Sequence, residues 1–363
     1  MCRPAGRFHT FFITFRRAAR NSSAAFPPVF TRVRSGSFNR ISGTFIMSYR
    51  MILAALAVVH IVWGGGFIVL KVVQEHLALE HILLGRVILA SLLYLLLWKR
   101  IPSPCYRKGD WKVLLLLALC EPFLLFTFET LGLRYTSASQ GGMIVACVPL
   151  TVALGAFAVY REKIGRRCLA GIVCAVCGVV VVSALATAGD QAPAPLLGNF
   201  FIFCAVLAST CYALSVKHLC ARYHYMYLAG VQVFGATVLF VPGALMQPLP
   251  PAHVLFSPQV AGSLLYLGLG ITFLVYFVIN YALTRIKAAV VIQFANLIPV
   301  STLVFAYIFL GERLSPTQYA GVGLVLAGVL LAGASGSGEL NTGKTQGEAH
   351  AQKACAAEGA AGD

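Results

Sequence analysis

The chain alternates long apolar runs with short polar connections. A helix rises about 1.5 Å per residue, so roughly 20 apolar residues can cross the hydrocarbon core of a bilayer. Lipid offers the backbone no hydrogen-bond partners, and a helix satisfies its own. Ten such runs lie at about residues 51–72, 80–98, 112–133, 139–159, 168–187, 198–217, 225–247, 260–283, 288–310 and 316–335. The sequence predicts an all-α polytopic membrane protein with ten transmembrane helices.

Basic residues in the connections indicate the orientation, because short cytoplasmic loops are enriched in Lys and Arg. The connections after the second, fourth, sixth and eighth apolar runs lie on one side of the membrane. Together they carry thirteen basic residues: Lys99, Arg100, Arg107, Lys108, Lys112, Arg161, Lys163, Arg166, Arg167, Lys217, Arg222, Arg285 and Lys287. The opposite side has three: Lys71, Arg134 and Arg313. Both termini are therefore predicted to be cytoplasmic.

Composition agrees with a membrane protein. Hydrophobic residues make up 59% of the 363 residues and charged residues 11%, whereas a soluble domain has about 25% charged residues. The net charge of +16 comes from an N-terminal segment with nine arginines and from scattered loop residues. Because no basic face results, we expect no nucleic-acid partner.

The two ends of the chain lie outside the apolar runs. Residues 1–50 are rich in Arg and hold no Asp, Glu or Lys. A gene start assigned too early, with Met47 as the true start, is favoured over a cytoplasmic arm and over an organelle transit peptide. Residues 336–363, rich in Gly and Ala, are predicted to form a disordered cytoplasmic tail.

Signatures of catalytic and metal sites are missing. The sequence has no His-Glu-x-x-His and no Gly-x-Ser-x-Gly, and its eight histidines are dispersed. Cys174-x-x-Cys177 lies in an apolar run without a second pair or a nearby histidine, so we interpret both cysteines as apolar filler. We expect no enzyme activity, no cofactor and no metal.

The chain also repeats itself at an offset of 150 residues. Six pairs align: Pro149/Pro299, Glu162/Glu312, Lys163/Arg313, Ile164/Leu314, Gly171/Gly321 and Gly178/Gly328. A duplication explains this agreement and divides the chain into repeats at 51–187 and 198–335. Each repeat has five spans, and an odd number inverts the second repeat relative to the first. Secondary transporters with such inverted repeats bind substrate near the bilayer midplane.

The order of several motifs resembles the EamA-type branch of the drug/metabolite transporter superfamily. The motifs are Trp63-Gly-Gly-Gly-Phe67, Arg86, Arg134-Tyr-Thr-Ser-Ala138, and the proline and glutamate of the fourth span, Pro149 and Glu162. The similarity covers about residues 51–335. It implies an exporter of amino acids, metabolites or drugs, and it does not supply the substrate.

Four ionisable residues of the first repeat, His60, Arg86, Glu121 and Glu129, have depths that suit a shared cavity. Glu121 lies near the middle of the third span, and Glu129 lies two turns further along roughly the same face. His60 and Trp63 lie near the middle of the first span. Arg86 of the second span lies at a depth between the two glutamates. Depth alone does not determine which side of each helix these residues occupy.

The repeat offers a second criterion for function. At the offset of 150 residues Glu121, Glu129 and Arg86 align with apolar residues, so these charges are unique to the first repeat. Ionisable groups inside a bilayer are costly and usually functional. Our hypothesis is that Glu121 or Glu129 exchanges a proton, while Arg86 binds an anionic substrate group or pairs with the unprotonated acid. The alternative is a structural Arg–Glu pair.

Other polar residues and two prolines complete the candidate set. Asn280, Gln293 and Asn296 are candidates for substrate contacts from the second repeat, or for hydrogen bonds between helices. Two roles are open for Trp63: stacking on a substrate, or filling space beside the glycines. For His60 we favour a role in helix packing. Pro149 and Pro299 lie near the middle of their spans and are predicted hinges. Glu162 and Glu312 are interpreted as structural anchors.

The sequence therefore predicts a secondary transporter of a small organic molecule, expected to be an exporter and proton-coupled, in a bacterial inner membrane. One alternative is an organellar antiporter for nucleotide sugars or phosphate esters. A membrane-embedded enzyme is the less favoured alternative. The partners expected are a small-molecule substrate and the lipid bilayer, and a homodimer is left open.

Overall fold

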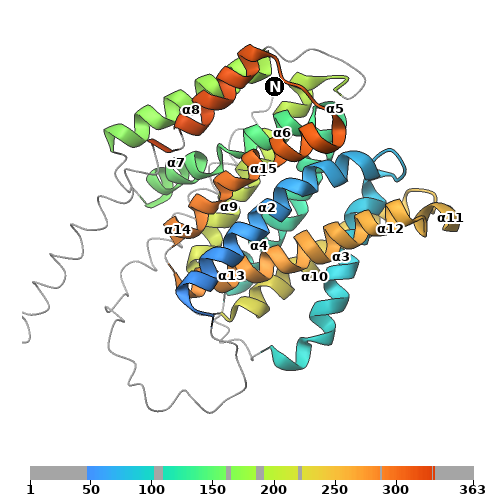
Figure 1. The fold of residues 1–363 in the computed structure, drawn as a ribbon. Helices are drawn as coiled ribbons and strands as arrows, with labels where there is room; N and C mark the ends of the chain where they lie inside the picture. The colour runs from blue at the N-terminus through green and yellow to red at the C-terminus, as the bar shows by residue number, and fades with distance from the viewer. Residues whose placement is uncertain are drawn as a thin grey trace, which may run out of the picture.

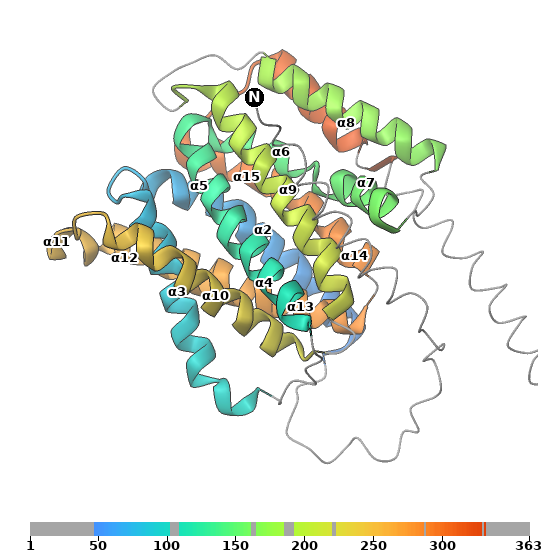
Figure 2. The same ribbon diagram turned by 180° about the vertical axis from the view of Figure 1, so that it is seen from behind.

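The structure is a computed structural model that describes residues 47–101, 109–160, 165–184, 192–219, 223–286, 288–328 and 330–331. The predictions for the N-terminal arm up to residue 46, for Glu162 and for the tail lie outside these residues. The described chain folds into a bundle of long helices, as Figures 1 and 2 show from opposite sides.

The helices follow the predicted runs. The first half contains α2 (Tyr49–Val73), α3 (Leu79–Leu96), α4 (Asp110–Ala118), α5 (Leu125–Tyr135), α6 (Ala138–Val145), α7 (Val148–Tyr160) and α8 (Arg166–Ala184). The second half contains α9 (Pro195–Leu219), α10 (Tyr225–Leu245), α11 (Ala252–Leu255), α12 (Pro258–Leu265), α13 (Tyr276–Arg285), α14 (Ala288–Gln293) and α15 (Leu297–Phe305). A final helix covers residues 316–328.

The predicted fold class is confirmed. Within the described residues, nine helical segments are long and apolar enough to cross a membrane, and the final helix occupies the tenth predicted run. Four spans each consist of two α-helices separated by a short irregular segment. These pairs of helices are α4 and α5, α6 and α7, α12 and α13, and α14 and α15. The third, fourth, eighth and ninth spans are thus the irregular ones, two in each repeat.

Serine residues define several helix starts. The Ser48, Ser137 and Ser257 side chains accept hydrogen bonds from backbone N–H groups three residues later, at the starts of α2, α6 and α12. Pro258 follows as the first residue of α12, where its missing N–H costs nothing. These caps satisfy donors that a helix cannot satisfy itself.

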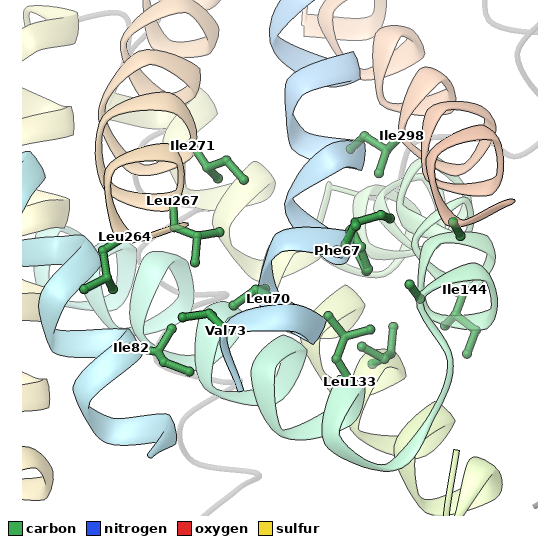
Figure 3. Close-up of a cluster of buried hydrophobic side chains, with 14 of the residues drawn as sticks. Phe67, Leu70, Val73, Ile82, Leu133, Ile144, Leu264, Leu267, Ile271 and Ile298 are labelled. Carbon is green, nitrogen blue, oxygen red and sulfur yellow. The ribbon is translucent and has the colours of Figure 1, made fainter. Parts of the chain in front are cut away.

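The two halves interlock through their core. α2 packs on α15, α3 on α10 and α5 on α9, so each pair joins one repeat to the other. Phe67 of α2 is fully buried and lies between Leu133 and Ile144 of the first half and Ile271 and Ile298 of the second (Figure 3). Close packing of this kind holds helices together in lipid, where the hydrophobic effect between helices is weak.

Glycines bring the last helix of each repeat into backbone contact. A Cβ atom on Gly178 would lie 2.7 Å from the Gly321 carbonyl oxygen, and one on Gly328 would lie 2.6 Å from the Gly171 carbonyl oxygen. α8 and the final helix lie side by side at one edge of the bundle in both views. We call this contact the glycine crossing; it joins the four glycines that the repeat aligned.

We predict that Gly328→Val destabilises the protein by about 1–3 kcal/mol, because the added atoms meet backbone that cannot move aside. The matched control is Gly323→Val in the same helix, where a Cβ atom would meet no heavy atom within 4 Å. Thermal unfolding of both variants in detergent measures the difference. Equal melting temperatures for the two variants would contradict the tight crossing.

Candidate functional site

The third span breaks at Glu121, in the middle of the bundle. Glu121 has φ −147° and ψ 117°, outside the helical region, and Pro122 has no N–H to donate. Irregular backbone inside a membrane is tolerated where the protein itself supplies hydrogen-bond partners. Gln232 of α10 supplies one: its Nε2 donates to the Glu121 carbonyl oxygen at 3.2 Å.

The eighth span is irregular at the corresponding place. Residues Tyr266–Val275 are wound more widely than an α-helix, and the Thr272 hydroxyl donates to the Leu267 carbonyl oxygen, five residues earlier, at 2.8 Å. The offset of 150 residues aligns this stretch with the break at Glu121. Both repeats therefore share the irregular backbone, whereas only the first carries the acid.

The Glu121 side chain is held by neutral hydroxyl groups of the second half. Tyr276 donates to Oε1 at 3.1 Å and Ser209 donates to Oε2 at 3.4 Å. Only 2% of Glu121 is exposed. The carboxyl group thus lies between elements of both repeats, and its position depends on how they approach one another.

A chain of hydrogen bonds extends from the Glu121 backbone carbonyl group, through Gln232, into the second half. Asn280 Nδ2 donates to Gln232 Oε1 at 3.0 Å, and the Tyr212 hydroxyl donates to Asn280 Oδ1 at 3.0 Å. Asn280 was a predicted site residue, whereas sequence reasoning missed Gln232, Tyr276, Tyr212 and Ser209. The signal available was their position as neutral polar groups within apolar runs.

Arg86 and Glu129 form a second charged region. Arg86 is completely buried, its Cζ lies 3.5 Å from the centre of the Phe126 ring, and its Nε donates to Thr272 Oγ1 at 3.1 Å. Its two terminal nitrogens have no described hydrogen-bond partner. Arg86 interacts electrostatically with Glu129.

A cavity of about 320 Å³ lies against these groups. Four predicted residues line it: His60, Trp63, Glu121 and Glu129. The other lining residues are Leu125, Val145, Val148, Val152, Ile202, Ala205, Val206, Ser209, Tyr212, Ala213, Val216, Ile279, Leu283, Val291, Ile292, Ala295 and Ile298. Both repeats contribute, so the cavity lies between them as an inverted-repeat transporter requires.

The remaining predicted contacts do not line the cavity. Arg86 and Asn280 are wholly buried behind its wall. Gln293 is exposed on α14, and Asn296 is half-buried with an Oδ1 atom that has no described partner. His60 faces the cavity while its Nδ1 lies 2.7 Å from the Leu56 carbonyl oxygen, one turn earlier. That contact is typical of a packed histidine and leaves the other ring nitrogen available.

The cavity lining reaches one end of the bundle. From the middle of the helices it continues to Val216 near the end of α9, Leu283 near the end of α13 and Val291 near the start of α14. These helix ends lie on the same side as the connections that hold thirteen of the sixteen basic residues counted in the sequence. At the opposite end the lining stops near Glu129 and Val145.

Polar contacts tie the helices together at that opposite end. The Glu312 carboxylate accepts hydrogen bonds from the backbone N–H groups of Ala138 and Ser139, at 3.0 and 2.9 Å. Lys71 donates to the carbonyl oxygens of Leu133 and Thr136, at 2.7 and 2.8 Å. We call Lys71, Glu312 and these partners the Glu312 seal. A carboxylate at a helix N-terminus is also favoured by the helix dipole.

Both predicted hinge prolines follow a helix interruption. α6 ends at Val145 and α7 begins at Val148, immediately before Pro149. The helix at Pro299 is interrupted at Phe294–Asn296, three residues before the proline. A proline in this position leaves a backbone carbonyl unpaired and weakens the helix locally.

The described residues form ten apolar helical spans in two inverted halves with a cavity between them, an arrangement typical of polytopic membrane transporters. The EamA-like transporter family matches residues 49–184 and again residues 196–334. The chain belongs to this family, and the two matches agree with the internal repeat.

Relatives with assigned names are also transporters. The chain is 27% identical to an uncharacterized transporter, YetK, of Bacillus subtilis strain 168, over 78% of this chain and 86% of that one. It is 28% identical to a protein of Salmonella typhimurium strain LT2 named "Probable amino-acid metabolite efflux pump", over 77% of this chain and 93% of that one. A "Probable terminal-alkyne amino-acid exporter" of Streptantibioticus cattleyicolor is 24% identical, over 76% and 91%.

A solved crystal structure has the same arrangement of helices. It superimposes with a TM-score of 0.54 and 14% sequence identity, and it covers 77% of this chain and 96% of its own. At this identity the likeness concerns the fold alone.

We predict that Gln232→Leu costs about 1–3 kcal/mol of stability, because it leaves the Glu121 carbonyl oxygen and Asn280 Nδ2 without their described partner in a buried place. A double-mutant cycle with Asn280→Leu separates the shared hydrogen bond, for which about 0.6 kcal/mol is typical within membranes. Thermal or denaturant unfolding in detergent measures the four proteins. Strictly additive losses would show that the two amides do not interact.

Proposed function

We propose that the protein is a secondary transporter that exports a small organic solute by alternating access and exchanges it for protons. Amino acids, metabolites and drugs are the candidate solutes. The observation that carries the proposal is the cavity, which lies between the two halves, holds two buried carboxyl groups and reaches one end of the bundle.

Glu121 is the residue to which we assign proton exchange. Its described side-chain partners are the neutral hydroxyls of Tyr276 and Ser209, so loss of its proton leaves a charge in surroundings of low dielectric constant. Uptake of a proton removes that charge. Glu129 differs from Glu121 because the positive charge of Arg86 lies nearby. Arg86 acts in this proposal as the permanent partner of Glu129.

The two ends of the cavity support the alternating-access part of the proposal. Transport requires the end near Leu283 to close and the Glu312 seal to open. The interruptions before Pro149 and within Phe294–Asn296 lie in the fourth and ninth spans, which line the cavity. We assign these interruptions the role of bend points, one in each repeat.

Orientation and location complete the proposal. The basic connections favour cytoplasmic termini in a bacterial inner membrane, which makes the open end of the cavity the cytoplasmic one. Export is supported by two relatives, which are named as an efflux pump and an exporter of amino acids or their metabolites.

Two alternatives have less support: transport of a phosphate-bearing substrate, and transport driven by nucleotide binding to this chain. A phosphate-bearing substrate would require cationic groups, and the lining residues include none besides His60. Residues 338–345 match the pattern Gly-x-x-x-x-Gly-Lys-Thr, but they lie outside the described residues. That pattern holds phosphate when it joins a strand to a helix, and here a transmembrane run precedes it, so we do not assign it a role in energy coupling.

We predict that Glu121→Gln abolishes substrate-dependent proton movement in proteoliposomes screened with pooled amino acids, metabolites and cationic drugs, because the amide cannot take up a proton. Arg86→Ala should also impair transport, since it leaves Glu129 without its cation. The control is Glu80→Gln, a glutamate in the first turn of α3 that does not line the cavity. Solute movement that is independent of protons and unchanged in Glu121→Gln would refute the coupling role.

We also predict that Glu312→Gln opens the sealed end more often, because an amide replaces a carboxylate that accepts two backbone hydrogen bonds. If the substitution removes about 1.4 kcal/mol of the interaction that keeps this end closed, the ratio of open to closed molecules rises about tenfold. In a cysteine-free protein that carries Val145→Cys, a membrane-impermeant maleimide added on the Glu312 side should react faster. Glu80→Gln, in the first turn of α3 at the same end, is the control. An unchanged rate would show that the seal does not hold this end closed.

A further inference from the structure

The charges that face the cavity are of one sign. Among its described lining residues, six side chains carry polar atoms: His60, Trp63, Glu121, Glu129, Ser209 and Tyr212. The others are aliphatic, and none is Lys or Arg. A solute in this cavity therefore meets two carboxyl groups and an apolar wall.

The two carboxyl groups differ in how they are compensated. Glu129 has the Arg86 guanidinium nearby. Glu121 has hydroxyl partners, and its other electrostatic neighbour is Glu129, which is of the same sign. Glu121 is thus the position at which a mobile cation gains the most.

Arg86 does not offer its charge to the cavity. The residue has no exposed surface, its guanidinium lies against the Phe126 ring, and it is absent from the lining. A carboxylate on a substrate would approach Glu121 and Glu129 without reaching a cation. Like charges in surroundings of low dielectric constant repel one another strongly.

Aromatic rings stand beside the uncompensated carboxyl group. The Tyr276 ring centre lies 6.4 Å from that of Trp63 and 6.5 Å from that of Tyr212, and both pairs are arranged edge to face. Aromatic faces attract organic cations, most strongly where water is excluded. The cavity of about 320 Å³ lies at the small end of the range for ligand pockets.

We propose that the substrate is an organic ammonium ion with a compact apolar body, whose positive group pairs with Glu121. This inference rests on the proposed transport function and names its substrate class. The Glu121 carboxylate then holds one cation at a time, either a proton or the ammonium group. When the proton leaves, the ammonium ion binds, and when the ammonium ion leaves, a proton returns. Charge at Glu121 is balanced in both loaded states, which gives an exchange of solute for proton.

Three probes of similar size and different charge test the substrate class: benzyltrimethylammonium, phenylalanine and 3-phenylpropionate. Their binding to the purified full chain in detergent is measured by calorimetry at two pH values. We expect the ammonium ion to bind at least tenfold more tightly than 3-phenylpropionate, with phenylalanine between them. We also expect its affinity to fall as the pH falls, because protons compete for Glu121.

Two variants assign the preference to one residue. Glu121→Gln should remove the preference for the ammonium ion, whereas Glu121→Asp should keep it at reduced affinity. Glu80→Gln should behave like the unmodified protein. If Glu121→Gln fails to fold, Glu121→Asp and the pH dependence still distinguish competition at this carboxyl group from its absence.

The outcomes separate this inference from the transport proposal. Equal or tighter binding of phenylalanine or 3-phenylpropionate would overturn the ammonium class and leave transport standing. If none of the three probes binds, the pooled transport screen decides: a transported ammonium ion supports the class, and a transported anion or zwitterion overturns it. If no solute in the pool moves, the transport function itself fails, and the inference fails with it.

Discussion

A polar group inside a bilayer must find its partner within the protein, and this constraint shapes the centre of the molecule. The break at Glu121 exposes backbone and places an acid where lipid could not tolerate it. Gln232, Tyr276 and Ser209 satisfy that backbone and that acid, and all three belong to the second half. The polar centre therefore exists only when both halves are assembled, so the site and the interface between the repeats are the same structure.

The two repeats agree in backbone and differ in charge. Both have an irregular third span and an interrupted fourth span at equivalent places. Hydropathy and the offset of 150 residues were sufficient to predict the ten spans and the inverted plan, because span length and repeat spacing depend on properties local to the sequence. The interruptions were harder to predict: Pro149 and Pro299 marked two of them, whereas no proline marks the wide turn at Tyr266–Val275.

The depth of each residue along its helix predicted part of the site. The rest depends on which side of each helix faces the cavity. The structure places His60, Glu121 and Glu129 on one cavity, as their depths suggested, whereas Arg86 of the same group does not line it. Trp63 also lines the cavity. The roles of these residues in transport stay predictions. Gln293 lies at a suitable position along the chain but on the exposed side of its helix. Hydrogen bonds such as Asn280 to Gln232 join residues 48 positions apart on different helices. Such pairing depends on helix rotation, which one sequence does not reveal.

The glycine crossing has a property that follows from its symmetry. Exchanging the two repeats converts the contact of Gly178 with Gly321 into the contact of Gly328 with Gly171, so the crossing maps onto itself. Transport by inverted repeats amounts to each half adopting the shape of the other. Everything away from the symmetry axis must then change its surroundings, whereas a self-symmetric contact keeps the same neighbours before and after. In the proposed alternating-access cycle the glycine crossing is therefore a fixed contact at the edge of the bundle, about which the two halves rearrange.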